Sequence, residues 1–208
     1  MTISDEPIGD FLARLAARVP VPGGGAAAAL HAAQGAALLG MVARYTTGSR
    51  YAQHEAAIGR IVAEVDELRT LALRLADADA DAFMAVQEAY LLPSSTEEDK
   101  AARSAAVAEA VVHAAWPLAQ IIGIAGMVVD LAEAMAAIGN RNVISDVAAA
   151  AEAARAAAST ARVNIEINLA SITDEQAGLE MIAEEGKADA IISRAEQVTA
   201  AVRDQIRA

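Results

Sequence analysis

The sequence has 208 residues, no cysteine and a formal net charge of −12, with 16 Lys and Arg among 28 Asp and Glu. This acidic balance argues against a nucleic-acid partner, because phosphate contacts need clustered cations. Without cysteine there is no disulfide or thiol chemistry, which fits a reducing, cytoplasmic setting. We expect no secretory signal and no membrane span, because no basic segment precedes an apolar one at the N-terminus and the uncharged run 114–129 is too short.

The composition predicts an all-α protein. Hydrophobic residues make up 55% of the chain and aromatic residues only 3%, and alanine, the strongest helix former, dominates. No segment alternates like a half-buried strand. We therefore expect one domain over residues 1–208, an up-and-down bundle of long, partly kinked, alanine-rich helices. Because alanine buries little area per residue, we also expect a homodimer with a shared helical interface.

The N-terminal third is organised around a glycine triplet. We expect a loose tail over 1–6, a short helix from Pro7 to Ala17, and a longer helix over 25–46. Two prolines and three glycines, Gly23, Gly24 and Gly25, precede the longer helix and permit a tight turn. The first amides of that helix suit an anion or a carbonyl oxygen. The alternative is a plain loop that lets two helices pack closely.

The segment 51–92 is helical throughout, and at roughly 1.5 Å per residue it would be about 63 Å long. A bend is expected within 77–81. Asp77 and Asp81 lie four apart on one face, and Asp79 lies on the other. If the pair is solvated, Asp79 points towards the core and needs donors around it. The alternative is a wholly exposed acidic face.

The next helices are predicted from capping residues and breakers. Ser95 and Glu98 have the spacing of a capping box, and Pro117 should kink or divide the helix that follows. That pattern stops at Gly139, a residue suited to the position after a helix C-terminus.

The C-terminal part begins with a turn over 140–146, after which Ser145 or Asp146 could cap another alanine-rich helix. On this helix Asn164 and Asn168 lie four apart and share a face. Residues 171–174 should start a last helix that continues to the C-terminus.

No P-loop, dinucleotide fingerprint or paired histidines at metal-ligand spacing occur, and the chain has three dispersed histidines. We therefore expect no metal site.

Several short motifs together resemble the cyclodeaminase/cyclohydrolase family, which comprises the helical domain of formiminotransferase-cyclodeaminase and free-standing methenyltetrahydrofolate cyclohydrolases. They occur in family order across nearly the whole chain. The motifs are Pro22–Gly25, Thr46–Tyr51, Asp79–Phe83, Leu92–Pro93, Thr96–Glu98 with Arg103, Pro117–Leu118, Gly139–Asn140, Asn142, Ser145–Asp146 and Asn164–Leu169.

The resemblance implies a tetrahydrofolate derivative as substrate and no further cofactor. One implied activity is hydrolysis of 5,10-methenyltetrahydrofolate to 10-formyltetrahydrofolate by metal-free acid–base catalysis. The alternatives are release of ammonia from 5-formiminotetrahydrofolate, and a non-catalytic helical dimer that binds a ligand or partner. A chain without a formiminotransferase domain favours the cyclohydrolase.

The resemblance also implies site residues. Asp79 and Asp146 are the candidate catalytic acids or bases. The candidate substrate-binding residues are Gly23, Gly24, Gly25, Asn140, Asn164 and Asn168, with Arg50 and Arg103 for an anionic glutamate tail. Ser49 and Ser94 stand where many relatives carry basic residues, which weakens the case for a polyglutamate tail.

Overall fold

The computed structural model describes residues 2–208, so Met1 lies outside the described residues. No strand occurs within this range, and the prediction of an all-α fold is confirmed. The α-helices are α1 (Ile8–Leu15), α2 (Gly24–Tyr45), α3 (Glu55–Tyr90), α4 (Glu97–Ile138), α5 (Ser145–Leu169), α6 (Glu175–Glu185) and α7 (Lys187–Arg207). Short 3-10 helices are η1 (Ile3–Asp5), η2 (Ser49–His54) and η3 (Arg141–Val143).

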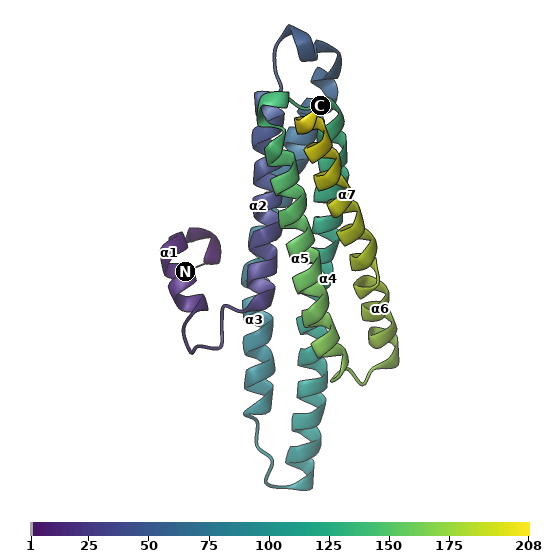
Figure 1. Ribbon diagram of the computed structural model, residues 1–208. Helices are drawn as coiled ribbons and strands as arrows, with labels where there is room; N and C mark the ends of the chain where they lie inside the picture. The colour runs from purple at the N-terminus through teal and green to yellow at the C-terminus, as the bar shows by residue number, and fades with distance from the viewer. Residues whose placement is uncertain (1) are drawn as a thin grey trace.

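The long helices form an up-and-down bundle (Figure 1). Helices α2, α3, α4 and α5 pack each against the next, and α7 covers the groove between α4 and α5. At about 1.5 Å per residue, α3 and α4 are roughly 54 and 63 Å long, against about 33 Å for α2. The α3–α4 hairpin therefore continues beyond the start of α2 and leaves one stretch of α3 uncovered by it.

Alanine and glycine allow the central helices to approach closely. A Cβ added to Gly35 of α2 would stand 3.1 Å from the carbonyl oxygen of Ala150 in α5, and Ala154 and Ala158 on the same α5 face are fully buried. By length and composition alone α2 and α4 could cross a membrane, but half or more of each apolar window is buried within the bundle. Their apolar residues thus serve the contacts between helices.

The two longest helices are more continuous than the sequence predicts. Helix α3 runs without a break through 77–81, a segment that contains no proline or glycine, and the bend expected there stays a prediction. Helix α4 is not divided at Pro117 either. Pro117 is buried together with Leu118 and Ile121, and this core contact offsets the one backbone hydrogen bond that proline removes.

Helix ends differ from prediction where several polar residues compete. The capping box that begins α4 is formed by Thr96 and Asp99, one residue after the predicted pair. Neither Ser145 nor Asp146 caps α5 by a side-chain hydrogen bond, since both lie inside its first turn.

The structure also differs from prediction near both termini. The predicted last helix is interrupted at Gly186, where α6 ends and α7 begins. The segment 2–6 is not a loose tail, because Ile3 is buried and its backbone N–H donates to Asp77 Oδ1 at 2.7 Å.

Candidate active site

The start of α2 is in direct contact with a carboxylate from α3. A Cβ added to Gly25 would stand 2.0 Å from Asp79 Oδ1 and 2.4 Å from its Cγ, so only glycine leaves room for this side chain. The backbone N–H of Ala26 donates to the Asp79 carboxylate. The first turn of α2 therefore receives an anion, as helix N-termini do, and here the anion is part of the protein.

Burial changes the chemistry of Asp79. Removal from water raises its pKa from 3.8 to about 6, and the hydrogen bond from Ala26 offsets only part of this effect. A carboxyl group with a pKa near 6 is present in both protonation states around neutral pH. It can therefore accept a proton in one step and return it in the next.

An amide from α5 stands beside this carboxylate. A Cβ added to Gly24 would be 3.2 Å from Asn164 Nδ2. Asn164 therefore contacts Gly24, and Asp79 contacts the next residue, Gly25. The Asn164 Nδ2 group donates to the Thr160 carbonyl oxygen at 2.8 Å, which fixes the orientation of the amide. Asn168 lies one helical turn further along α5 and is half-buried.

Other residues that the sequence placed in the site lie at the opposite end of the bundle. Asp146 is in the first turn of α5, 18 residues before Asn164, which corresponds to about 27 Å along the helix. The two candidate catalytic carboxylates, Asp79 and Asp146, therefore lie far apart within a single chain. Arg50 is near Asp146's end of the bundle, in η2, with its guanidinium 5.8 Å from the Tyr51 ring centroid.

Asn140 has a structural role at the end of the bundle where Asp146 lies. Its backbone N–H donates to Thr46 Oγ1 at 3.0 Å, and its Nδ2 group donates to the Tyr45 carbonyl oxygen at 2.7 Å. Its Oδ1 accepts a hydrogen bond from the Asn142 backbone N–H. These bonds hold the α4–α5 connection against the end of α2, and they occupy polar groups that were predicted to bind substrate.

Gly139 ends α4, as the sequence predicts, and begins this connection in an extended conformation, with φ −69°. Glycine is needed there for space, because an added Cβ would lie 2.5 Å from the Met135 carbonyl oxygen.

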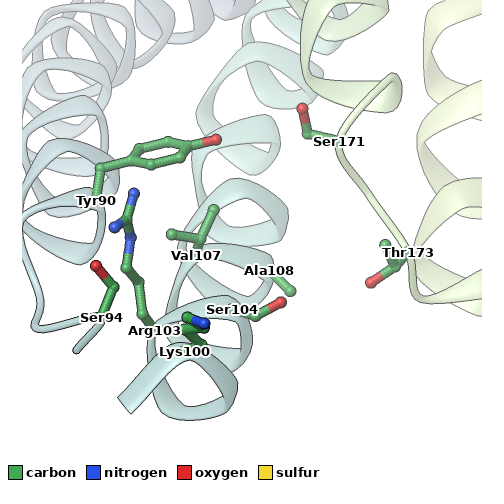
Figure 2. Close-up of a pocket in the computed structure, with 9 residues that line it drawn as sticks. All are labelled: Tyr90, Ser94, Lys100, Arg103, Ser104, Val107, Ala108, Ser171 and Thr173. Carbon is green, nitrogen blue, oxygen red and sulfur yellow. The ribbon is translucent and has the colours of Figure 1, made fainter. Parts of the chain in front are cut away.

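Arg103 lines a hollow of about 340 Å³ between the end of α3, the start of α4 and the α5–α6 connection. Figure 2 shows its side chain beside Tyr90, with Ser94 and Lys100 nearby. Tyr90 and Lys100 were not predicted from the sequence. The spacing of Tyr90 from Asp79 was the available signal, since 11 residues are close to three helical turns.

Within the described residues no group of three or more His, Cys, Asp or Glu side chains is arranged to hold a metal ion.

The sequence is similar to those of proteins of known family. A sequence profile described as formiminotransferase-cyclodeaminase matches residues 7–187. Over 172 residues the chain is 41% identical to a methenyltetrahydrofolate cyclohydrolase from Methylorubrum extorquens, a match that covers 82% of each protein. It is 37% identical to formimidoyltransferase-cyclodeaminase from Sus scrofa over 82% of this chain, but the match spans only 32% of that longer protein.

A solved structure agrees with this assignment. The crystal structure of formiminotetrahydrofolate cyclodeaminase from Thermotoga maritima matches with a TM-score of 0.87 and 29% identity, covering 98% of this chain and 99% of that one. The chain therefore belongs to the formiminotransferase-cyclodeaminase family, and its bundle is the cyclodeaminase fold.

The raised pKa of Asp79 predicts a pH-dependent gain in stability on its replacement. A carboxyl group whose pKa is higher in the folded state destabilises the fold at pH values above about 6, and this cost disappears as the pH falls towards 4. Asp79→Asn keeps an acceptor for Ala26 and should raise the free energy of unfolding by about 1–3 kcal/mol at pH 8. Urea unfolding at pH 8, 6 and 4.5 measures this gain, which should shrink with pH. Asp81→Asn, at an exposed position, is the control.

The Gly25 contact predicts a steric effect. Gly25→Ala should destabilise the protein by about 1–3 kcal/mol, because the new methyl group and the Asp79 carboxylate cannot both keep their places. The matched control is Gly59→Ala in α3, where an added Cβ meets nothing within 4 Å. Equal urea midpoints for the two variants would contradict this packing.

Proposed function

We propose that this protein is a one-carbon folate enzyme that hydrolyses 5,10-methenyltetrahydrofolate to 10-formyltetrahydrofolate. The observation that carries the proposal is Asp79, a carboxyl group with a pKa of about 6 held beside Asn164 at the start of α2. The similarity to a methenyltetrahydrofolate cyclohydrolase over 82% of both chains supports the same reaction.

The chemistry requires one group that moves a proton. The methenyl carbon lies between two nitrogens and shares their positive charge, so water can add to it without prior activation of the carbon. The ionised Asp79 takes a proton as the water oxygen bonds to the carbon. It then returns that proton to N5 as the C–N5 bond breaks, while the hydroxyl group of the adduct loses its own proton to solvent and becomes the carbonyl oxygen of the formyl group on N10. We propose that this sequence needs no metal ion, because the carbon is already electrophilic.

The neighbouring groups have supporting roles in this proposal. The negative charge of Asp79 offsets the charge of the cationic ring, and this stabilisation is strong because the carboxylate is largely shielded from water. The Asn164 side chain, held by Thr160, orients the pterin or the one-carbon unit, and Asn168 extends the same polar face of α5. Gly24 and Gly25 make room for Asn164 and Asp79, whereas Gly23, where an added Cβ meets nothing within 4 Å, lets the substrate approach the start of α2 closely.

A second candidate activity is cyclodeamination of 5-formiminotetrahydrofolate, and the match to the Thermotoga maritima cyclodeaminase structure favours it. There a folate nitrogen attacks the formimino carbon, and ammonia leaves after it has been protonated. Asp79 is suited to this proton transfer too.

Two assays with the purified protein separate the activities. Hydrolysis consumes 5,10-methenyltetrahydrofolate and lowers its absorbance faster than in the buffer blank, whereas cyclodeamination releases ammonia from the formimino compound and raises that absorbance. We expect the first result. Failure of both assays would instead support a non-catalytic, ligand-binding protein.

Asp79→Asn should lower kcat for hydrolysis by roughly 10²–10⁴-fold, because an amide cannot accept the proton of the attacking water. In the unmodified protein kcat should rise with pH through about 6 and then level off, since Asp79 must be ionised to act as base. A rate of hydrolysis that Asp79→Asn leaves unchanged would remove the proposed base. Asp81→Asn is again the matched control, two residues away on the same helix.

We also propose that the protein is a cytoplasmic homodimer. Large apolar side chains are exposed on α1 and α5, where Ile8 is 79% and Ile167 67% exposed. Within one chain Asp146 is too far from Asp79 to share its chemistry, so only a second copy could supply it. Sedimentation equilibrium should give twice the 21.3 kDa chain mass. A mass of one chain at micromolar concentration would contradict the dimer.

A further inference from the structure

The segment 2–6 is attached to α3 beside the turn that carries Asp79. The backbone N–H of Ile3 donates to Asp77 Oδ1 at 2.7 Å, and Ile3 is only 7% exposed. Asp77 precedes Asp79 by two residues, which is about 3 Å along the helix axis. A contact between residues 74 positions apart in the chain therefore lies next to the proton-transfer group.

The segment 2–6 is itself held by hydrogen bonds. Thr2 Oγ1 donates to Asp5 Oδ2 at 2.6 Å across η1. The Glu6 side chain, which is 3% exposed, accepts a hydrogen bond from Arg14 Nη1 at 2.9 Å. This ion pair joins the segment to α1, and breaking it would leave a shielded carboxylate without its partner. The segment and α1 therefore form one structural unit.

Helix α3 has little other support at this point. Its buried residues form a regular series up to Ala76, and the next buried residue after Ala76 is Ala89. Asp79 lies at the beginning of this less buried stretch, where α3 passes the start of α2 (Figure 1). The position of Asp79 therefore depends on the contacts that this one turn of α3 makes.

Two contacts hold this turn from different sides. Gly25 lies against Asp79, and Ile3 is bonded to Asp77. Because successive residues of an α-helix are about 100° apart, Asp77 and Asp79 leave α3 in directions about 200° apart. The chain from Ile3 to Gly25 thus contacts α3 at both of its ends, and the two contacts lie on nearly opposite faces of the helix.

We propose that the segment 2–6 positions the proton-transfer carboxylate, because its hydrogen bond to Asp77 keeps the turn that bears Asp79 against Gly25. Asp77 is a positioning residue that acts through Asp79. The inference rests on the proposed function for the role of Asp79, although the placement of Asp79 can be tested without any substrate. Neither Ile3 nor Asp77 belongs to the motifs shared with the family, and the profile match begins only at residue 7.

Amide hydrogen exchange, measured by NMR on the full-length protein, tests this placement. Ala26 lies in the first turn of α2, where an N–H group has no partner within the helix, and its N–H donates to the Asp79 carboxylate. Its exchange rate therefore reports the contact between α2 and Asp79. In Asp77→Ala the Ala26 amide should exchange about tenfold faster than in the unmodified protein.

Two variants separate the hydrogen bond from the charge. Asp77→Asn removes the same negative charge as Asp77→Ala but keeps an oxygen that accepts from the Ile3 N–H, so Ala26 should still exchange slowly. Asp81→Ala removes an exposed carboxylate that also lies two residues from Asp79, and it should leave the rate unchanged. Ile3→Ala weakens the attachment from its other side with α3 unaltered, and should speed the exchange as Asp77→Ala does.

Turnover tests whether this placement serves the proposed reaction. Asp77→Ala should lower kcat for methenyltetrahydrofolate hydrolysis by about tenfold and change KM by less than about twofold, because a displaced proton-transfer group affects the transition state more than substrate binding. Asp77→Asn and Asp81→Ala should keep the kcat of the unmodified protein.

The outcomes separate the two proposals. Equal Ala26 exchange in Asp77→Ala and Asp81→Ala would overturn the positioning role, and so would faster exchange with an unchanged kcat. If the Ala26 amide exchanges faster in Asp77→Ala and Ile3→Ala only, but the unmodified protein turns over neither folate, the placement of Asp79 by the segment 2–6 is supported and the proposed activity fails. Circular dichroism checks that each variant is folded.

Discussion

The structure depends on one close contact, in which the Asp79 carboxylate of α3 lies against Gly25 at the start of α2. The contact needs a glycine, because any side chain would occupy the space of the carboxylate. It gives the helix start an anion and keeps that anion from water, which brings its pKa to about 6. A carboxylate buried in this way is unfavourable for folding, and that cost is what suits the group for proton transfer near neutral pH.

The sequence predicted the helices well because alanine content and apolar spacing are local properties. For Asp79 it left two alternatives open, a side chain that points towards the core and a wholly exposed acidic face, and the buried carboxyl group agrees with the first. It did not predict that Asp79 contacts Gly25 and that Asn164 contacts Gly24, because these contacts join three helices that are distant in the chain. The breaks between helices were predicted less well. Pro117 does not divide α4, because the packing of this buried stretch outweighs one lost backbone hydrogen bond. Gly186 carried no strong sequence signal, yet α6 ends and α7 begins there.

Two groups of the motif residues lie at opposite ends of α2. At the start of α2 lie Gly24, Gly25, Asp79 and Asn164. At the end of α2, Asn140 donates hydrogen bonds to Tyr45 and Thr46. A motif match alone does not separate these two kinds of residue. Hydrogen bonds do, because the Asn140 side chain is already engaged with backbone groups, whereas the Asp79 carboxyl group can still change its protonation state.

Helix α3 carries both the proton-transfer group and Tyr90, which borders the hollow beside Arg103, on one uninterrupted rod. The separation between them is therefore set by helical rise and not by the closing of a loop or a domain. The continuous helix α3 therefore holds these two places at a fixed spacing. A ligand that spanned both places would have to match this fixed length, and no large motion of the protein would be needed to bind it.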